Sequence, residues 1–384
     1  SKCGIRGTWQ ARIKFNNVKI PAENLLGQEG RGLNIALSCL NYGRCTLSAG
    51  MLGGARRASA QATKWATTRF QFGKALAEQE LVRKRIAHMA APNYAMDSVL
   101  YMTTGMLDRK DEDHQVETAL CKVFCSEMGW RVVNDAMQIM GGEGYMTENE
   151  VERIFRDSRI NLIVEGANEV MQSYVFGYGG KALAERMLGI KNALLKDSDE
   201  SLGAFIGKAL KASTNPKIMK IAIPLGLEVY LGIRGRMPRI DNIHQDLRPH
   251  AERLCVLTRE LSHQFKVQSK RYDVAMLTRQ AVQARMADVA MYLHAWACTL
   301  SKLDSDLRKH SGNGAGDLEF QRDKAAAMHF FDIAELEIHN RFIELFENAD
   351  DSMLETATLA IRYSDSLPAT NIIIPEKPPT HHRG

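Results

Sequence analysis

The sequence is poor in the features that mark secreted, membrane-spanning or nucleic-acid-binding proteins. Its 384 residues include seven cysteines, an odd number that argues against a disulfide framework. No apolar run approaches the length of a membrane-spanning helix, and no signal peptide opens the chain. The formal net charge of +5 does not suggest a nucleic-acid partner. We therefore expect a protein that is kept in a reducing compartment and not secreted.

The cysteines do not predict a metal centre either. Cys121 and Cys125 stand one helical turn apart, but no second Cys/His pair has the spacing of a zinc site, so we expect packing cysteines. With 45% hydrophobic residues, 25% charged residues and only 10 prolines, the composition suits roughly two helical domains with cores of their own.

The first half of the chain changes from a strand pattern to a helical one. Apolar residues alternate over residues 11–20, which predicts a remnant β-hairpin. From Gly32 the period becomes helical, and Pro92 is expected to kink or locally break its helix. Further helices are predicted at residues 80–107, 115–140, 151–157 and 167–188. Long helices with short connections predict an antiparallel four-helix bundle.

The second half returns to a helical pattern after a polar junction. Apolar residues recur at helical spacing over residues 274–298 and 325–343. Basic and apolar residues mix over residues 202–239, where a membrane-associating segment and ordinary solvated packing remain alternatives, and Pro216, Pro224 and Pro238 should interrupt any helix. The sequence predicts a mainly α fold in five parts: the end of a β domain (1–30), the bundle (31–190), a linker (191–241), a second helical domain (242–366) and an extended tail (367–384).

The most informative stretch is VERIFRDSRINLIVEGANEV, residues 151–170. It places Glu165 directly after the apolar Leu162, Ile163 and Val164 and before Gly166. Such a carboxylate should be partly desolvated, as a proton-abstracting group requires, and the glycine lets a ligand approach the backbone. The alternative is a surface glutamate at the mouth of a helix that starts at Ala167.

Four motifs in order resemble those of the acyl-CoA dehydrogenases. They are GRGLNIALSCLNYGR from residue 30, TTRFQFGKALAEQ from residue 67, MQIMGGEGYMTENEVERIFRDSRI from residue 137 and EGANEV from residue 165. Each motif alone is weak, but their order makes the resemblance specific. The added helices of the second half, including RQAVQARMADVAMYLHAW, resemble the very-long-chain members of that family. By this resemblance, the family's amino-terminal helical domain and most of its central sheet would precede Ser1.

The resemblance implies removal of hydrogens from the α and β carbons of a fatty acyl-CoA, giving the trans-2-enoyl-CoA. Glu165 would be the α-proton base, its backbone N–H would help to hold the enolate oxygen, and FAD would accept the hydride. Asn41, Arg44, Val164 and Gly166 would lie beside the substrate. The residues implied at FAD are Arg69, at the pyrophosphate, and Gln71, Phe72, Gln138, Gly141, Gly142, Ala167 and Glu169.

The resemblance also implies partners and a location. FAD contacts that cross subunits imply an oligomer, expected to be a homodimer, and the expected electron acceptor is an electron-transfer flavoprotein. Peripheral membrane contact is implied for the linker. A bacterial cytoplasm or a mitochondrial matrix, with its inner membrane, fits a β-oxidation enzyme of this family.

Several positions depart from the family pattern. EGA replaces the common EGT, so Ala167 offers no hydroxyl, Ser173 replaces a common arginine and Glu80 stands where several members have glutamine. Some relatives carry the base immediately before the arginine that matches Arg44, but this chain has Gly43 there, which favours Glu165. Two alternatives remain: a helical assembly or membrane-docking module that does not catalyse, and an acyl-CoA oxidase that passes electrons to oxygen.

Overall fold

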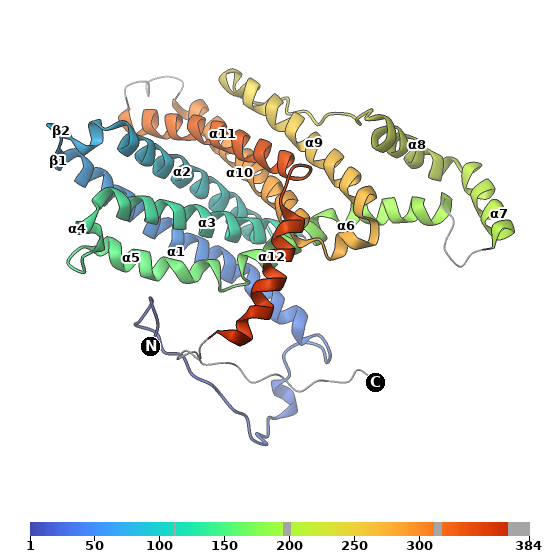
Figure 1. The fold of residues 1–384 in the computed structure, drawn as a ribbon, viewed down its shortest axis with the longest axis horizontal. Helices are drawn as coiled ribbons and strands as arrows, with labels where there is room; N and C mark the ends of the chain where they lie inside the picture. The colour runs from blue at the N-terminus through green and yellow to red at the C-terminus, as the bar shows by residue number, and fades with distance from the viewer. Residues whose placement is uncertain (111–112, 195–200, 311–316, 368–384) are drawn as a thin grey trace.

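The computed structural model describes residues 1–110, 113–194, 201–310 and 317–367. Four long helices form an up-and-down bundle in which consecutive helices run antiparallel (Figure 1). They are α1 (Gly32–Thr68), α2 (Glu80–Asp108), α3 (Gln115–Met140) and α6 (Asn168–Leu194). The predicted helical bundle is confirmed. The break considered at Pro92 does not occur: this proline is buried inside α2, which is continuous.

Short elements connect the long helices. Between α1 and α2 lies an antiparallel hairpin of β1 (Phe70–Gln71) and β2 (Lys74–Ala75), followed by the 3-10 helix η2 (Leu76–Glu78). Between α3 and α6 lie α4 (Gly142–Tyr145), α5 (Glu150–Ser158) and the 3-10 helix η3 (Arg159–Leu162). The hairpin and α4 lie at the same end of the bundle (Figure 1).

Small residues let α1 approach α3 closely. Ala55, Ala58, Ala62 and Ala66 recur at three- and four-residue spacing on α1, and all four are fully buried. An alanine face brings helix axes close together, so the backbone of α1 and the side chains of α3 can meet directly. This approach fixes the relative position of the two helices that surround the candidate site.

The second half packs on the bundle as an extension of it. Its main helices are α9 (Arg248–Tyr272), α10 (Gln280–His310) and α11 (Leu318–Glu344), with 3-10 turns η4 (Gln245–Leu247) and η5 (Asp273–Leu277). The Phe124 ring of α3 meets Tyr292 of α10 and Phe330 of α11 edge to face, at centroid distances of 6.4 and 5.8 Å. One apolar core therefore runs from the bundle into α10 and α11.

The predicted linker is largely helical. It contains α7 (Leu202–Ser213) and α8 (Pro216–Leu231) (Figure 1). Pro216 occupies the first turn of α8, where its missing N–H costs little, but Pro224 lies inside the helix without interrupting it. The buried carboxylate of Glu228 secures α8 to α9 by an ion pair with Lys266 at 2.7 Å.

The strands expected over residues 11–20 are not formed. This segment is extended and unpaired, and Ile13, Phe15, Val18 and Ile20 are all exposed. A hairpin needs further strands or a packed face to be stable, and none of the described residues provides one. Only the short 3-10 helix η1 (Ala22–Asn24) interrupts the amino-terminal segment.

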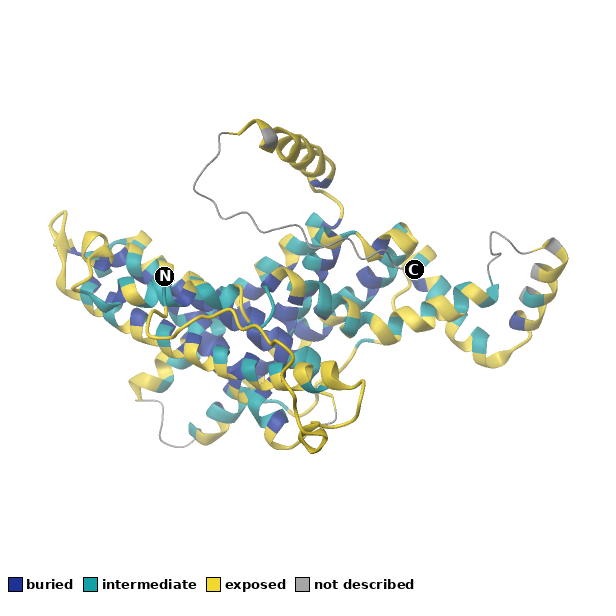
Figure 2. Ribbon diagram, turned by 90° about the horizontal axis from the view of Figure 1, so that it is seen from below, coloured by how far each residue is buried: buried dark blue, intermediate teal, exposed yellow. Residues whose placement is uncertain are grey.

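The last helix, α12 (Asp350–Tyr363), stands almost entirely in solvent (Figure 2). Its first residue is anchored by a bidentate pair in which Arg285 donates to both carboxylate oxygens of Asp350, at 2.8 and 2.5 Å. The 3-10 turn η7 (Ser364–Ser366) follows it. The predicted tail beyond residue 367 and the polar junction at residues 195–200 lie outside the described residues.

Candidate active site

Glu165 lies in a tight turn between η3 and α6. The N–H of Val164 still bonds the carbonyl of Ile160 at 3.1 Å, and the chain then reverses through Glu165 with φ 57° and Gly166 with φ 94°. Glycine tolerates this left-handed region, whereas a glutamate in it is held there by its surroundings. The turn directs the side chain of Glu165 back toward α1.

The carboxylate of Glu165 lies against the backbone of α1 at Gly43. A Cβ atom at position 43 would stand 2.8 Å from each carboxylate oxygen, so the absence of a side chain makes the room for Glu165. The Oε2 atom is buried and has no hydrogen-bond partner among the described residues. A buried carboxylate oxygen that no protein group satisfies is available to accept a proton from a ligand.

The close approach at Gly43 predicts a specific effect of Gly43→Ala. The added methyl group should displace the carboxylate by several tenths of an ångström or more, and we expect turnover to fall about 10- to 100-fold, as misplaced catalytic groups do. Helix propensity favours alanine, so the free energy of unfolding should not fall by more than about 1 kcal/mol. Steady-state kinetics and denaturant unfolding would check both, with Gly50→Ala, whose Cβ meets nothing within 4 Å, as the matched control.

Asn41 and Arg44 stand beside this carboxylate on α1, and both are buried. The Asn41 carbonyl oxygen accepts from Arg44 Nη1 and from Thr118 Oγ1, each at 3.1 Å. The guanidinium also lies over the ring of Tyr174 at 5.7 Å, and its Nε has no partner among the described residues. Burial lowers the pKa of Arg44, whereas Tyr174 and Glu165 oppose that shift. The structure thus places Asn41 and Arg44, the residues implied beside the substrate, close to Glu165, the implied base.

The covering of Glu165 differs from the expected one. Ile163 and Val164 are 52% and 40% exposed, so the apolar residues before Glu165 do not enclose its carboxylate. The backbone of α1 at Gly43, rather than these side chains, shields the Glu165 carboxylate from water. Tyr42, the neighbour of Gly43 on α1, is exposed as well.

The backbone around Glu165 also offers a donor. The N–H of Glu165 donates to no oxygen of the described part of the chain. Three other predicted site residues lie close by in the chain: Gly166 and Ala167 lie in the turn itself, and Glu169 is exposed on the first turn of α6. An unpartnered N–H and an unpartnered carboxylate oxygen on one residue can serve the two ends of a proton abstraction next to a carbonyl.

Lys122 contributes to this site although the sequence analysis assigned it no role. It is fully buried on α3, and its Nζ donates to the Gly166 carbonyl at 2.7 Å and to Asn168 Oδ1 at 2.6 Å. The available signal was its position in ALCKVFC, where a single lysine interrupts an apolar stretch of a helix. Lysine is so often solvent-exposed that this signal is easily passed over.

The second group of candidates lies at the other end of the bundle. Arg69, Gln71 and Phe72 are exposed at the hairpin, and Gln138 is exposed near the carboxyl end of α3. At 1.5 Å per helical residue, Arg69 lies about 40 Å along α1 from Gly43. The structure therefore divides the predicted site residues into two separate groups.

The hairpin group fits a phosphate-bearing ligand such as FAD. A Cβ at Gly141 or Gly142 would meet nothing within 4 Å, and Gly141 adopts φ 61°, so the backbone there is open to a ligand. The planar guanidinium of Arg69 suits phosphate oxygens, and amides such as Gln71 can bond a sugar or base. Ala167, at the other end of the bundle, has no side-chain hydroxyl to offer a cofactor.

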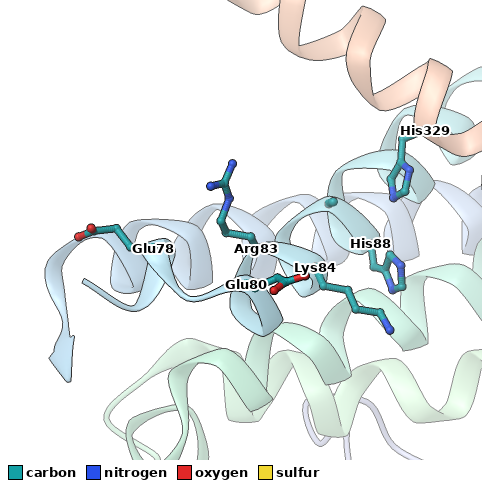
Figure 3. A pocket seen from close by; sticks show the side chains of 7 residues that line it. Glu78, Glu80, Arg83, Lys84, His88 and His329 are labelled. Atoms are coloured by element: carbon teal, nitrogen blue, oxygen red, sulfur yellow. The ribbon is translucent and has the colours of Figure 1, made fainter. Parts of the chain in front are cut away.

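A further hollow lies between the start of α2 and α11, and it contains none of the predicted site residues. Figure 3 shows Glu78, Glu80, Arg83 and Lys84 around it, with His88 and His329 at one side. The two imidazoles stack with their ring centroids 5.9 Å apart, and burial lowers the pKa of His88.

The described part of the chain contains no cluster of three or more metal-ligating side chains. Within that same part, every helix is too short or too polar to cross a bilayer.

Comparison with known proteins assigns a family to this arrangement. Residues 30–176 match the model of the acyl-CoA dehydrogenase C-terminal domain. The very long-chain specific acyl-CoA dehydrogenase of mouse mitochondria is 31% identical over 306 residues, which is 80% of this chain and 44% of the mouse protein. The mycobacterial protein named "Probable acyl-CoA dehydrogenase FadE10" (Mycobacterium tuberculosis) is 28% identical over 94% of this chain and 55% of its own length.

A solved structure is similar over nearly the whole chain. The acyl-CoA dehydrogenase of Bacillus anthracis, solved with FAD, has 26% sequence identity and a TM-score of 0.60, covering 92% of this chain and 56% of that one. The chain thus spans about half the length of the relatives it matches. On the motifs, the bundle and these similarities, the chain belongs to the acyl-CoA dehydrogenase family.

Proposed function

We propose that this chain carries the catalytic base of an FAD-dependent dehydrogenase that converts a fatty acyl-CoA to its trans-2-enoyl-CoA. The observation that carries the proposal is the Glu165 carboxylate, whose Oε2 is buried without a partner against the bare backbone of Gly43. An unused carboxylate in such a place costs stability, so its presence is explained best by a reaction that uses it.

In the proposed reaction, Glu165 accepts the proton from the α carbon of the thioester. Its own backbone N–H donates to the thioester oxygen, where negative charge develops as that proton leaves. Arg44, held by Asn41, keeps a positive charge near the Glu165 carboxylate. FAD, when bound, supplies the acceptor for the hydride that leaves the β carbon.

The hairpin group is proposed to hold FAD across a subunit boundary. Arg69, Gln71, Phe72, Gln138 and the Gly141 backbone lie too far from Glu165 to contact one extended dinucleotide together with it. Two copies of the chain resolve this separation if the hairpin group of one protomer holds the cofactor that serves the Glu165 of the other. A homodimer is therefore part of the proposal.

Long acyl chains and contact with a membrane surface are proposed on separate grounds. A relative at 31% identity is named as specific for very long chains. On α7 and α8, exposed Ile206, Leu210, Ile221 and Tyr230 accompany Lys211, Lys217 and Lys220, which suits an anionic lipid surface. An electron-transfer flavoprotein is the proposed acceptor, and a bacterial cytoplasm or a mitochondrial matrix is the proposed location.

The proposal is tested by mixing the FAD-loaded protein with palmitoyl-CoA under anaerobic conditions. We expect the flavin absorbance to bleach and one trans-2-enoyl-CoA to form per flavin. Rapid return of the absorbance with hydrogen peroxide on admission of oxygen would indicate an oxidase. Bound flavin that is not bleached by acyl-CoA of any chain length would favour the non-catalytic helical module.

A further inference from the structure

The Glu165–Gly166 turn is a conformation that requires support. Two successive residues have positive φ, 57° and 94°, and the first of them is not glycine. A left-handed glutamate costs on the order of 1 kcal/mol or more, and such residues persist where neighbouring groups hold them. The exact path of this turn also decides where the carboxylate lies relative to α1.

Lys122 supplies that support from inside the bundle. Its ammonium group bonds Gly166 O at 2.7 Å and Asn168 Oδ1 at 2.6 Å, so one side chain of α3 joins the turn to the first residue of α6. The Asn168 amide nitrogen in turn donates to Ser126 Oγ at 3.0 Å and to Glu127 Oε1 at 2.7 Å. Side chains of α3 therefore hold both the Gly166 carbonyl in the turn and Asn168 at the start of α6.

The stability of the fold does not explain a lysine in this place. The side chain is fully buried, and no carboxylate of the described residues lies within ion-pair distance of it. Burial lowers the pKa of Lys122 to about 8, with Glu127 as the largest opposing influence. An apolar residue of similar length would avoid the cost of desolvating an ammonium group, which suggests that the lysine has a role beyond packing.

We propose that Lys122 is a positioning residue that holds the Gly166 carbonyl and Asn168, and thereby aims the Glu165 carboxylate at the space beside Gly43. This inference rests on the proposed role of Glu165 as the base. Lys122 acts through the turn and touches neither substrate nor cofactor. Without it, the turn can relax toward conformations in which the carboxylate is displaced from α1.

The test compares Lys122→Met with Lys302→Met in the FAD-loaded protein. Methionine keeps the length and apolar body of lysine but cannot bond Gly166 O. Lys302 is a matched control, because it is also partly buried between helices, in an ion pair with Asp97 at 3.2 Å, but it contacts none of the site residues. We expect Lys122→Met to lower kcat about 10- to 100-fold while KM changes less than about threefold. The same variant should speed amide hydrogen exchange of residues 163–168, and Lys302→Met should do neither.

Two further variants make the result decisive. If Lys122→Met does not fold, Lys122→Gln, which retains an N–H donor on a shorter arm, should show the same changes to a smaller extent. A folded variant with unchanged kcat and unchanged exchange of residues 163–168 would overturn the positioning role. Glu165→Gln is measured in parallel: if that variant still turns over normally, the proposed function fails first, and the exchange experiment alone decides whether Lys122 holds the turn.

Discussion

Replacing Glu165 by glutamine is expected to lower the rate of substrate-dependent flavin bleaching by about 10²- to 10⁴-fold, the usual contribution of a general base. Glutamine has nearly the same shape as glutamate, so the turn and its packing against Gly43 can be kept. The amide cannot accept the α proton. Anaerobic stopped-flow mixing with palmitoyl-CoA measures this rate directly.

Stability and cofactor content should not fall in the Glu165→Gln variant. No hydrogen bond to the carboxylate Oε2 is lost, since that atom has no partner among the described residues. Exposed Glu185 on α6, the helix that follows the turn, provides a matched control, because Glu185→Gln makes the same chemical change away from the site. Bleaching of Glu165→Gln at the rate of the unaltered protein would exclude Glu165 as the base.

The long helices could be predicted from the sequence because their ends carry local signals. The predicted helix at residues 115–140 agrees with α3 at both ends, since a polar loop precedes it and Gly141, with positive φ, follows it. Prolines were less reliable signals. Pro224 lies within α8 and Pro92 within α2, because tertiary packing of the flanking turns outweighs one missing hydrogen bond.

The motifs select residues that lie close together in the structure, but they do not predict the geometry of the candidate site. The motifs singled out Glu165, Asn41 and Arg44, and the structure brings these three together. The contact of Glu165 with Gly43 joins positions 122 residues apart and depends on the close approach of α1, which no local pattern reports. Lys122 was missed because its role appears only when its two acceptors, in a different segment, are known.

Strand pairing at the amino-terminal segment could not be predicted from the sequence for a different reason. The alternation over residues 11–20 is a genuine strand signal, but a strand also needs a neighbour to satisfy its backbone groups. Local sequence encodes the preference of a segment, whereas pairing depends on what lies beside it. The same reasoning explains why exposed apolar residues concentrate there.

Phe330→Ala is expected to destabilise the whole protein by about 3–5 kcal/mol, the cost of emptying a buried aromatic site. Phe330 of α11 is fully buried, and its ring meets Phe124 of the bundle at 5.8 Å. Because one core joins α3, α10 and α11, loss of this ring should weaken the bundle and the added helices together. Denaturant unfolding followed by circular dichroism and by tryptophan fluorescence should show coincident transitions, both at a lower midpoint.

The exposed Leu336 of the same helix is the control for this experiment, and Leu336→Ala should change the free energy of unfolding by no more than about 0.5 kcal/mol. Tryptophans report on both regions, since Trp65 and Trp130 lie in the bundle and Trp296 is buried in α10. If Phe330→Ala instead separates an early transition at Trp296 from an unchanged transition of the bundle, then α9 to α11 form an independently folding domain. Coincident transitions would mean that the added helices contribute directly to the stability of the helices that position Glu165.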